Sequence, residues 1–262
     1  MVSFGSVPDS TCCCHDVYQP DRCGVVGSIT VDSPPKFTLP ASIHRGIQSA
    51  TAPFASKTIS TLQHRSTEFA ALCSVFGHLL EFAKIATTMP STVWLTDQDL
   101  QSNFLLAAHI LLSIPRYHVW DVAGPSIHSH LALREAVRLA LLLFMVQATV
   151  SLAGDHEWEQ NYAGRIPGLL RVSEVDWSGL EDLELWVLVL GALHERGDDR
   201  EWLFVQISQR MTRQRLHWQE MMRRVKGILW VDETFSELAN KLEGDWIKHA
   251  DLEASLCVPR AT

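Results

Sequence analysis

The sequence lacks the motifs of several large enzyme classes. Its 262 residues contain no G-x-G-x-x-G or G-x-x-x-x-G-K-[ST] phosphate-binding loop. The nearest approach to a G-x-S-x-G nucleophile motif, at Gly124 to Ile127, continues with His128, and no strand is predicted before it. No two histidines stand four residues apart, so the His-Glu pairs at His156 and His194 lack the second histidine of an H-E-x-x-H zinc site. We therefore nominate no catalytic, cofactor-binding or metal-binding residue.

The chain also lacks C-x2-C pairs and a secretory signal sequence. Four of its six cysteines stand within the first 23 residues, whereas a disulfide framework is normally spread through a small secreted domain. The N-terminus has no basic start followed by an apolar run. We expect free thiols in a reducing compartment, with Cys73 as a small core residue rather than a reactive thiolate.

No apolar run is long enough for a membrane span. The richest, from Leu139 to Ala153, contains Gln147 and Thr149 and falls short of the roughly 20 apolar residues that a span needs. The run from Leu185 to Leu193 is shorter still. Both runs are apolar on all sides, which predicts central helices covered by neighbours rather than a membrane protein.

Residues 1–61 differ in composition from the rest of the chain. The first 60 residues contain six of the eleven prolines and none of the nine tryptophans. Such a segment cannot bury enough apolar surface to fold, so we expect a disordered leader or linker over 1–61. A helical domain is expected over 62–252 and a C-terminal tail over 253–262.

The domain is predicted to be all-α, a multi-helix bundle with a buried apolar central helix. Apolar residues recur at spacings of three and four in successive segments separated by prolines or glycines, and no hairpin signal appears. The predicted inward-facing sets begin at Phe69, at Leu100 after a Thr96 cap, at Trp218 and at Phe235. A further helix is expected from Pro125 to Gly154.

The stretch "HERGDD", residues 194–199, predicts a tight joint between two helices. Ser178 and Glu181 form an S-x-x-E capping box before the first helix, and Asp198 and Glu201 repeat the arrangement before the second. The alternative is a magnesium site of the D-D-x-x-D type, but the third acid would be residue 202, which is a tryptophan. We therefore favour the capping role for these acids.

The net charge is -8, and the acidic excess lies outside residues 1–65, which hold five Lys and Arg and four Asp and Glu. An acidic body is poorly suited to binding nucleic acid. The one local basic stretch is 210–226. Arg213, His217, Glu220 and Arg224 follow helical spacing, which favours the solvated outer face of an amphipathic helix over a phosphate-binding patch.

Four aromatic and aliphatic segments follow one another along the chain. They are "LREAVRLALLLFMV" within 131–146, "LWVLVLGAL" (185–193), "REWLFVQI" (200–207) and "WQEMMRRVKGILWVDETF" (218–235). Their order resembles that in the regulatory (middle homology) domain of fungal zinc-cluster transcription factors, and the likeness covers roughly the last half of the chain. The resemblance implies a helical domain that modulates transcription in the nucleus, in some cases by sensing a small molecule.

The family's zinc-cluster DNA-binding module is not matched. That module needs six cysteines built on C-x2-C-x6-C half-sites, whereas Cys12, Cys13 and Cys14 are adjacent and eight residues separate Cys14 from Cys23. The mismatch argues against direct DNA binding by this chain. The expected partners are the transcription machinery or other regulator proteins, with a small apolar ligand in the core and a homodimer as further alternatives.

The expected function is therefore that of a regulatory domain and not of an enzyme, without a cofactor. An all-helical enzyme with a site of scattered residues is one alternative. A fragment of a longer regulator that has no function alone is another, and a nucleic-acid binder that uses 210–226 is a third.

Overall fold

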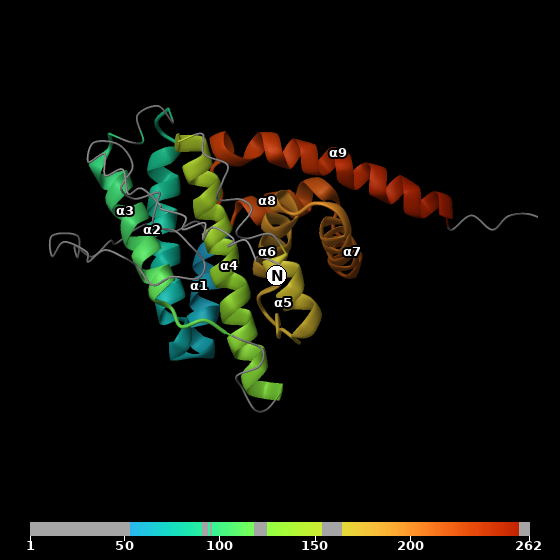
Figure 1. The fold of residues 1–262 in the computed structure, drawn as a ribbon, viewed down its shortest axis with the longest axis horizontal. Helices are drawn as coiled ribbons and strands as arrows, with labels where there is room; N and C mark the ends of the chain where they lie inside the picture. Colours follow the sequence, from blue (N-terminus) through green and yellow to red (C-terminus); the bar gives the residue numbers. More distant parts are fainter. Residues whose placement is uncertain (1–52, 91–93, 95, 118–124, 154–163, 257–262) are drawn as a thin grey trace, which may run out of the picture.

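The computed structural model describes residues 53–90, 94, 96–117, 125–153 and 164–256. These residues form an all-α fold (Figure 1) of nine α-helices and one 3-10 helix, η3. The elements are α1 (Pro53–Arg65), η3 (Thr67–Phe69), α2 (Ala70–Ala86), α3 (Gln98–Ser113), α4 (Pro125–Ala153), α5 (Arg165–Val172), α6 (Glu181–His194), α7 (Gly197–Gln214), α8 (Trp218–Lys226) and α9 (Asp232–Leu256).

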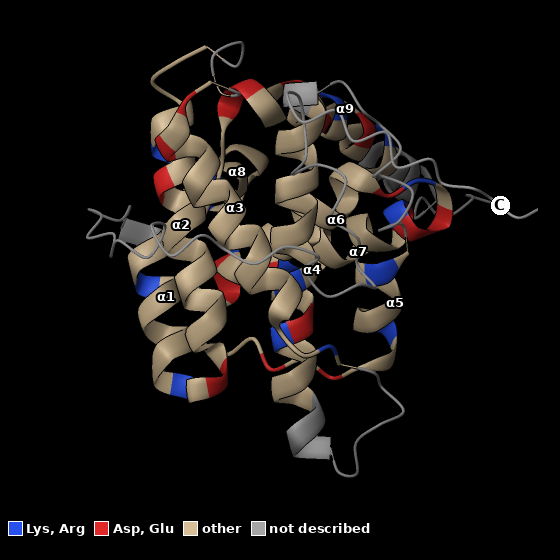
Figure 2. Ribbon diagram, turned by 60° about the vertical axis from the view of Figure 1, so that its left-hand side comes forward, with Lys and Arg blue, Asp and Glu red and all other residues tan. Residues whose placement is uncertain are grey.

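Helix α4 lies between two groups of helices. Helices α1, α2 and α3 pack on one side of it, and α5, α6 and α7 lie on the other (Figure 2). Helix α8 packs against α6, while α9 contacts α4, α6 and α7 and extends beyond the bundle toward its C-terminal end (Figure 1). This arrangement surrounds α6 with α1, α4, α5, α7, α8 and α9.

The two long apolar runs form buried helices, as predicted. Every residue of 135–150 in α4 and of 183–192 in α6 is buried. The α6 residue Trp186 is fully buried, and its indole Nε1 donates to the carbonyl oxygen of Leu229 at 2.8 Å. A buried indole N–H needs such an acceptor, so this bond fixes the chain after α8 against the middle of α6.

A different segment, Thr67–Ala86, is long and apolar enough by composition to cross a membrane, and half of it is buried in the fold. Its inward side chains include Phe76 and Phe82, both fully buried. Phe82 makes aromatic contacts with Phe104 of α3 and Phe144 of α4, with ring centroids 5.3 and 6.5 Å apart. Packing against α3 and α4 thus explains why Thr67–Ala86 has an apolar face.

The helical region is longer than the expected 62–252. Helix α1 begins at Pro53, inside the range expected to be a leader, because Ala55, Thr58 and Leu62 form a buried face at spacings of three and four. At the other end α9 continues to Leu256. Residues 1–52 and 257–262, and with them most of the expected leader and tail, lie outside the described residues.

The expected caps are wrong in detail. Asp97, not Thr96, caps α3, because its carboxylate accepts from the amide of Leu100 at 2.8 Å. Ser178 does not cap α6, whose N-cap is Leu180, without a side-chain cap bond. Serine and aspartate hydroxyl or carboxylate oxygens can satisfy several nearby amides, so the motif alone does not fix the capping residue.

Candidate functional site

The candidate site is a pocket between α5, the loop that follows it, α6 and α7. Its volume is about 260 Å³, close to the lower end of the range of small-molecule sites. All four segments contribute to its apolar wall, which consists of Leu170, Val175, Trp177, Leu188 and Trp202. The other lining residues are polar, namely Ser173, Glu174, Glu184, Gln206 and Arg210, so the pocket combines an apolar wall with polar groups.

An ion pair between a buried glutamate and a partly exposed arginine lies in the same pocket. The carboxylate oxygen Oε1 of Glu184, from α6, accepts from Nε of Arg210, from α7, at 2.9 Å. Arg210 also donates from Nη1 to Oε1 of Gln206 at 2.7 Å. Glu184 is only 6% exposed, so its charge is largely withdrawn from bulk solvent and Arg210 compensates it.

One further polar atom in the pocket has no partner. Ser173 ends α5, and its hydroxyl oxygen is buried without a hydrogen bond among the described residues. Buried hydroxyls are normally satisfied by protein, water or ligand. This oxygen and the Glu184 carboxylate are therefore two polar groups that a bound molecule could contact.

The loop that carries Trp177 is held by α1 and α4. Arg65, the last residue of α1, donates to the carbonyl oxygens of Asp176, at 2.7 Å, and of Ser178. Ser129 of α4 accepts from the Asp176 amide at 2.9 Å. Hydrogen bonds from the Ser178 hydroxyl and amide, and the charge of Arg65, lower the pKa of Asp176. One wall of the pocket is thus anchored by distant elements.

The predicted joint between two helices is confirmed, but by different contacts from those expected. Helix α6 ends at His194 and α7 begins at Gly197, whose φ of 55° lies in the left-handed region that favours glycine. Asp198 is not the N-cap of α7, because it lies in the first turn. An acid there still interacts favourably with the positive end of the helix dipole.

The other acids of the joint hold α5 in place. Glu195 accepts from the amide of Gly164, the N-cap of α5, at 2.7 Å, and burial raises the pKa of this glutamate. Asp199 pairs with Arg171 at 2.5 Å. Arg171 in turn lies over the Trp202 ring, 5.0 Å from its centroid. Among the residues that the structure describes, no group of three His, Cys, Asp or Glu side chains could hold a metal ion.

The basic stretch 210–226 is not one amphipathic helix. Helix α7 ends at Gln214, Arg215 adopts a left-handed conformation with φ 54°, and α8 starts at Trp218. The spacing of three and four that predicted a single outer face therefore runs across a break between two helices. A left-handed residue at a helix end is a common way to reverse the chain, although glycine or asparagine is more usual there.

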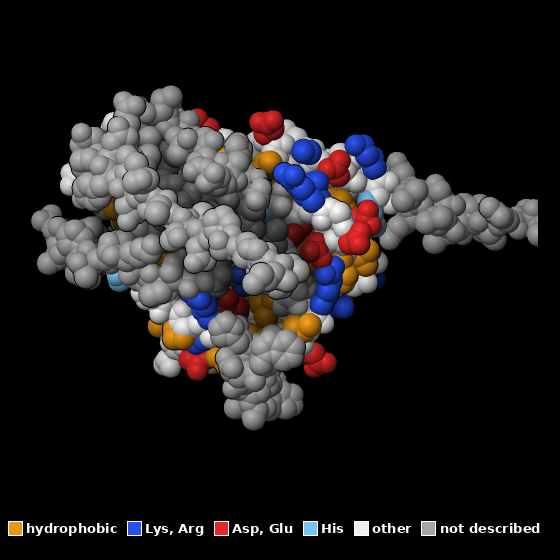
Figure 3. Space-filling view, viewed as in Figure 1, with side chains coloured by type: hydrophobic (Ala, Val, Ile, Leu, Met, Phe, Trp, Pro, Cys, Tyr) orange, Lys and Arg blue, Asp and Glu red, His pale blue; other side chains and the backbone are white. Residues whose placement is uncertain are grey.

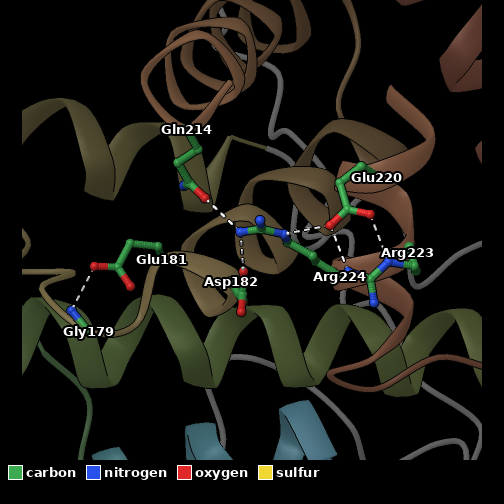
Figure 4. A network of polar contacts seen from close by, with 7 residues as sticks. All are labelled: Gly179, Glu181, Asp182, Gln214, Glu220, Arg223 and Arg224. Carbon is green, nitrogen blue, oxygen red and sulfur yellow. Dashed lines mark hydrogen bonds and ion pairs between the residues drawn. The ribbon is translucent and has the colours of Figure 1, made fainter. Parts of the chain in front are cut away.

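Acidic side chains pair with most of the basic residues in this stretch, and Figure 4 shows the contacts of Arg223 and Arg224. Arg224 donates to Asp182 at 3.3 Å, Gln214 at 3.0 Å and Glu220 at 3.2 Å, and so joins α6, the end of α7 and α8. Arg223 forms two further bonds to Glu220, and these arginine bonds lower the pKa of Glu220 to about 2. In the coloured part of Figure 3 the two signs of charge alternate without a large basic patch.

Two other candidate chemical groups are buried. Burial raises the pKa of the Cys73 thiol to about 11, consistent with its expected role in the core. Burial also lowers the pKa of His194 to about 4, and its Nε2 has no partner among the described residues. Residue 124, His156 and the side chains of 125–128 lie outside what the structure describes.

No family model, curated protein or solved structure matches the chain. The site is thus defined by its own geometry, which offers binding groups on an apolar wall. Sequence reasoning missed this pocket and α5. The available signal was Trp177, an aromatic residue within a polar loop, and Trp202, which follows a charged run.

Proposed function

We propose that this chain is a small-molecule-responsive regulatory domain of the fungal zinc-cluster transcription-factor type. It acts in the nucleus through contacts with the transcription machinery or other regulator proteins, and it is not an enzyme. The observation that carries the proposal is the pocket between α5, α6 and α7, with its apolar wall and the partly buried Glu184–Arg210 pair.

The position of the pocket supports a regulatory role. Three of its four parts are helices, and α6 and α7 contain two of the segments that resemble the family, 185–193 and 200–207. Of the other two segments, one lies in α4 and the other spans α8 and the first turn of α9, and these three helices all pack against α6. A ligand that contacts α6 therefore touches the helix that contains one of the segments and that the helices of the other three pack against.

The polar contacts of 210–226 support action through proteins rather than through DNA. Arg210, Arg223, Arg224 and Lys226 are each paired with a carboxylate. Phosphate binding would have to compete with these internal partners, and little net positive charge would remain to release counterions from DNA.

A reporter experiment tests the proposal. The full chain is fused to an unrelated DNA-binding domain in a fungal cell, and transcription from the matching promoter is compared with that from the DNA-binding domain alone. We expect the fusion to change transcription and Trp177→Ala to alter that change, because the substitution removes part of the pocket wall. Arg223→Gln, outside the pocket, is the matched control. Equal transcription with and without the chain would refute the regulatory role.

A further inference from the structure

The polar groups of the pocket define the class of ligand that fits it. We propose that the pocket binds a small organic cation, an amine that is protonated at neutral pH and attached to an aromatic or other apolar body. The inference rests on the proposed small-molecule role of this pocket and narrows it to one chemistry.

The first argument is the unused capacity of Glu184. A carboxylate can accept several hydrogen bonds through its two oxygens. Oε1 of Glu184 is occupied by Arg210, whereas Oε2 has no hydrogen-bond partner among the described residues. The Ser173 hydroxyl oxygen is also free to accept. A ligand that donates hydrogen bonds, such as an ammonium group, is complementary to these acceptors.

The second argument is charge. The charged side chains that line the pocket are Glu174, Glu184 and Arg210, two carboxylates and one guanidinium. The nearby Arg171 is paired with Asp199, so that pair adds no net charge. The guanidinium of Arg210 already donates from two of its three nitrogens to protein oxygens. The excess negative charge therefore favours a cation over an anion.

The third argument is the wall. Trp177 and Trp202 both line the pocket, and tryptophan is the side chain whose ring attracts cations most strongly. Trp202 already accepts one such contact, from Arg171. Leu170, Val175 and Leu188 complete an apolar surface for the body of the ligand. The small volume, about 260 Å³, limits that body to roughly one ring.

Three probes with the same phenyl ring and different head groups test the inference. They are 2-phenylethylammonium chloride, 2-phenylethanol and sodium 3-phenylpropionate, each titrated into the full chain and followed by isothermal calorimetry and ligand-observed NMR. We expect the ammonium probe to bind at least about tenfold more tightly than the alcohol, the factor that a hydrogen bond to a charged group supplies. The carboxylate should bind most weakly.

Two substitutions should change the binding of the ammonium probe in opposite directions. Glu184→Gln keeps the size of the side chain but removes its charge, and should weaken binding by about tenfold. Arg210→Gln removes the competing cation and should tighten binding at pH 8. Tighter binding cannot result from misfolding, so the second variant keeps the test valid even if the first unfolds. Arg223→Gln should leave binding unchanged.

The outcomes separate the ligand class from the proposed function. If the alcohol binds as tightly as the amine, or the carboxylate binds more tightly than the amine, the ligand of the pocket is not a cation. The proposed small-molecule role of the pocket is not affected by that result. If none of the three probes binds, the inference fails, and the reporter experiment still decides the regulatory role independently. Weaker binding in an Arg210→Gln variant whose urea midpoint matches that of the wild type would also overturn the inference.

Discussion

A buried ion pair lies in the middle of α4. Removing one of its two charges should strongly destabilise the fold, whereas replacing both residues by apolar ones should not. Arg138 donates to both carboxylate oxygens of Glu135, from Nε at 2.9 Å and from Nη2 at 2.7 Å. The arginine side chain is 1% exposed and the glutamate side chain 9%. Glu135→Gln removes the compensating charge, and Arg138 cannot lose its proton at accessible pH.

The expected cost of Glu135→Gln is about 3–5 kcal/mol, the range for leaving one partner of a buried pair without compensation. That is a large part of the roughly 5–15 kcal/mol that stabilises a typical domain. Replacing both residues, Glu135→Leu with Arg138→Met, removes the desolvation cost of both charges. The double variant should therefore be about as stable as the wild type, or more stable.

Urea denaturation followed by circular dichroism provides the measurement, with the midpoint and slope fitted for each variant. The chain offers a matched control in Arg223 and Glu220, which form the same two-bond pair at the same spacing on the surface. Arg223→Gln should change the free energy of unfolding far less than Glu135→Gln. The reasoning is refuted if the buried and exposed substitutions cost the same, or if the double variant is as unstable as Glu135→Gln.

Four further predictions concern single residues. The pKa of His194 is lowered to about 4, so the free energy of unfolding should fall as the pH drops from 6.5 toward 4, because only the unfolded chain takes up this proton; His194→Gln should reduce that dependence in urea titrations at several pH values. The pKa of Cys73 is raised to about 11, so its peptide should stay unmodified by iodoacetamide at pH 8 until denaturant is added, as judged by mass spectrometry. Gly77→Ala should raise the thermal midpoint by stabilising α2 by about 0.5–1 kcal/mol, since its new Cβ meets nothing within 4 Å. Gly191→Ala should gain less or lose stability, because Leu203 Cδ1 lies 3.3 Å from the new Cβ.

The sequence was most informative where long apolar runs decide the structure. The runs in α4 and α6 are apolar on all sides, and this property alone predicts helices buried by neighbours. Helix α1 was missed because polar residues, among them several serines and threonines, separate its buried positions Ala55, Thr58 and Leu62. Its spacing carried the signal, but its composition resembled that of a linker.

The hydrogen-bond partners of individual polar side chains could not be predicted where several nearby groups are about equally suitable. The S-x-x-E pattern at Ser178 and Glu181 is real, but Ser178 bonds to Asp176, and Glu181 accepts from the amide of Gly179 instead of that of Ser178. The pocket is harder still. Glu184 and Arg210 are separated by 26 positions and meet only because α6 and α7 fold back on each other.

The hydrogen bonds from Arg65 to the loop that carries Trp177 limit how far the chain can be shortened from its N-terminus without affecting the pocket. A fragment that starts at residue 62, where composition changes, would keep Arg65 but lose most of the helix that holds it, including the buried Ala55 and Thr58. The core around α4 and α6 would remain, so such a fragment could fold and yet hold Trp177 loosely. If such a fragment failed to bind a ligand, the cause would be the loss of α1 and not the absence of a binding pocket. A binding study should therefore begin with a chain that includes Pro53.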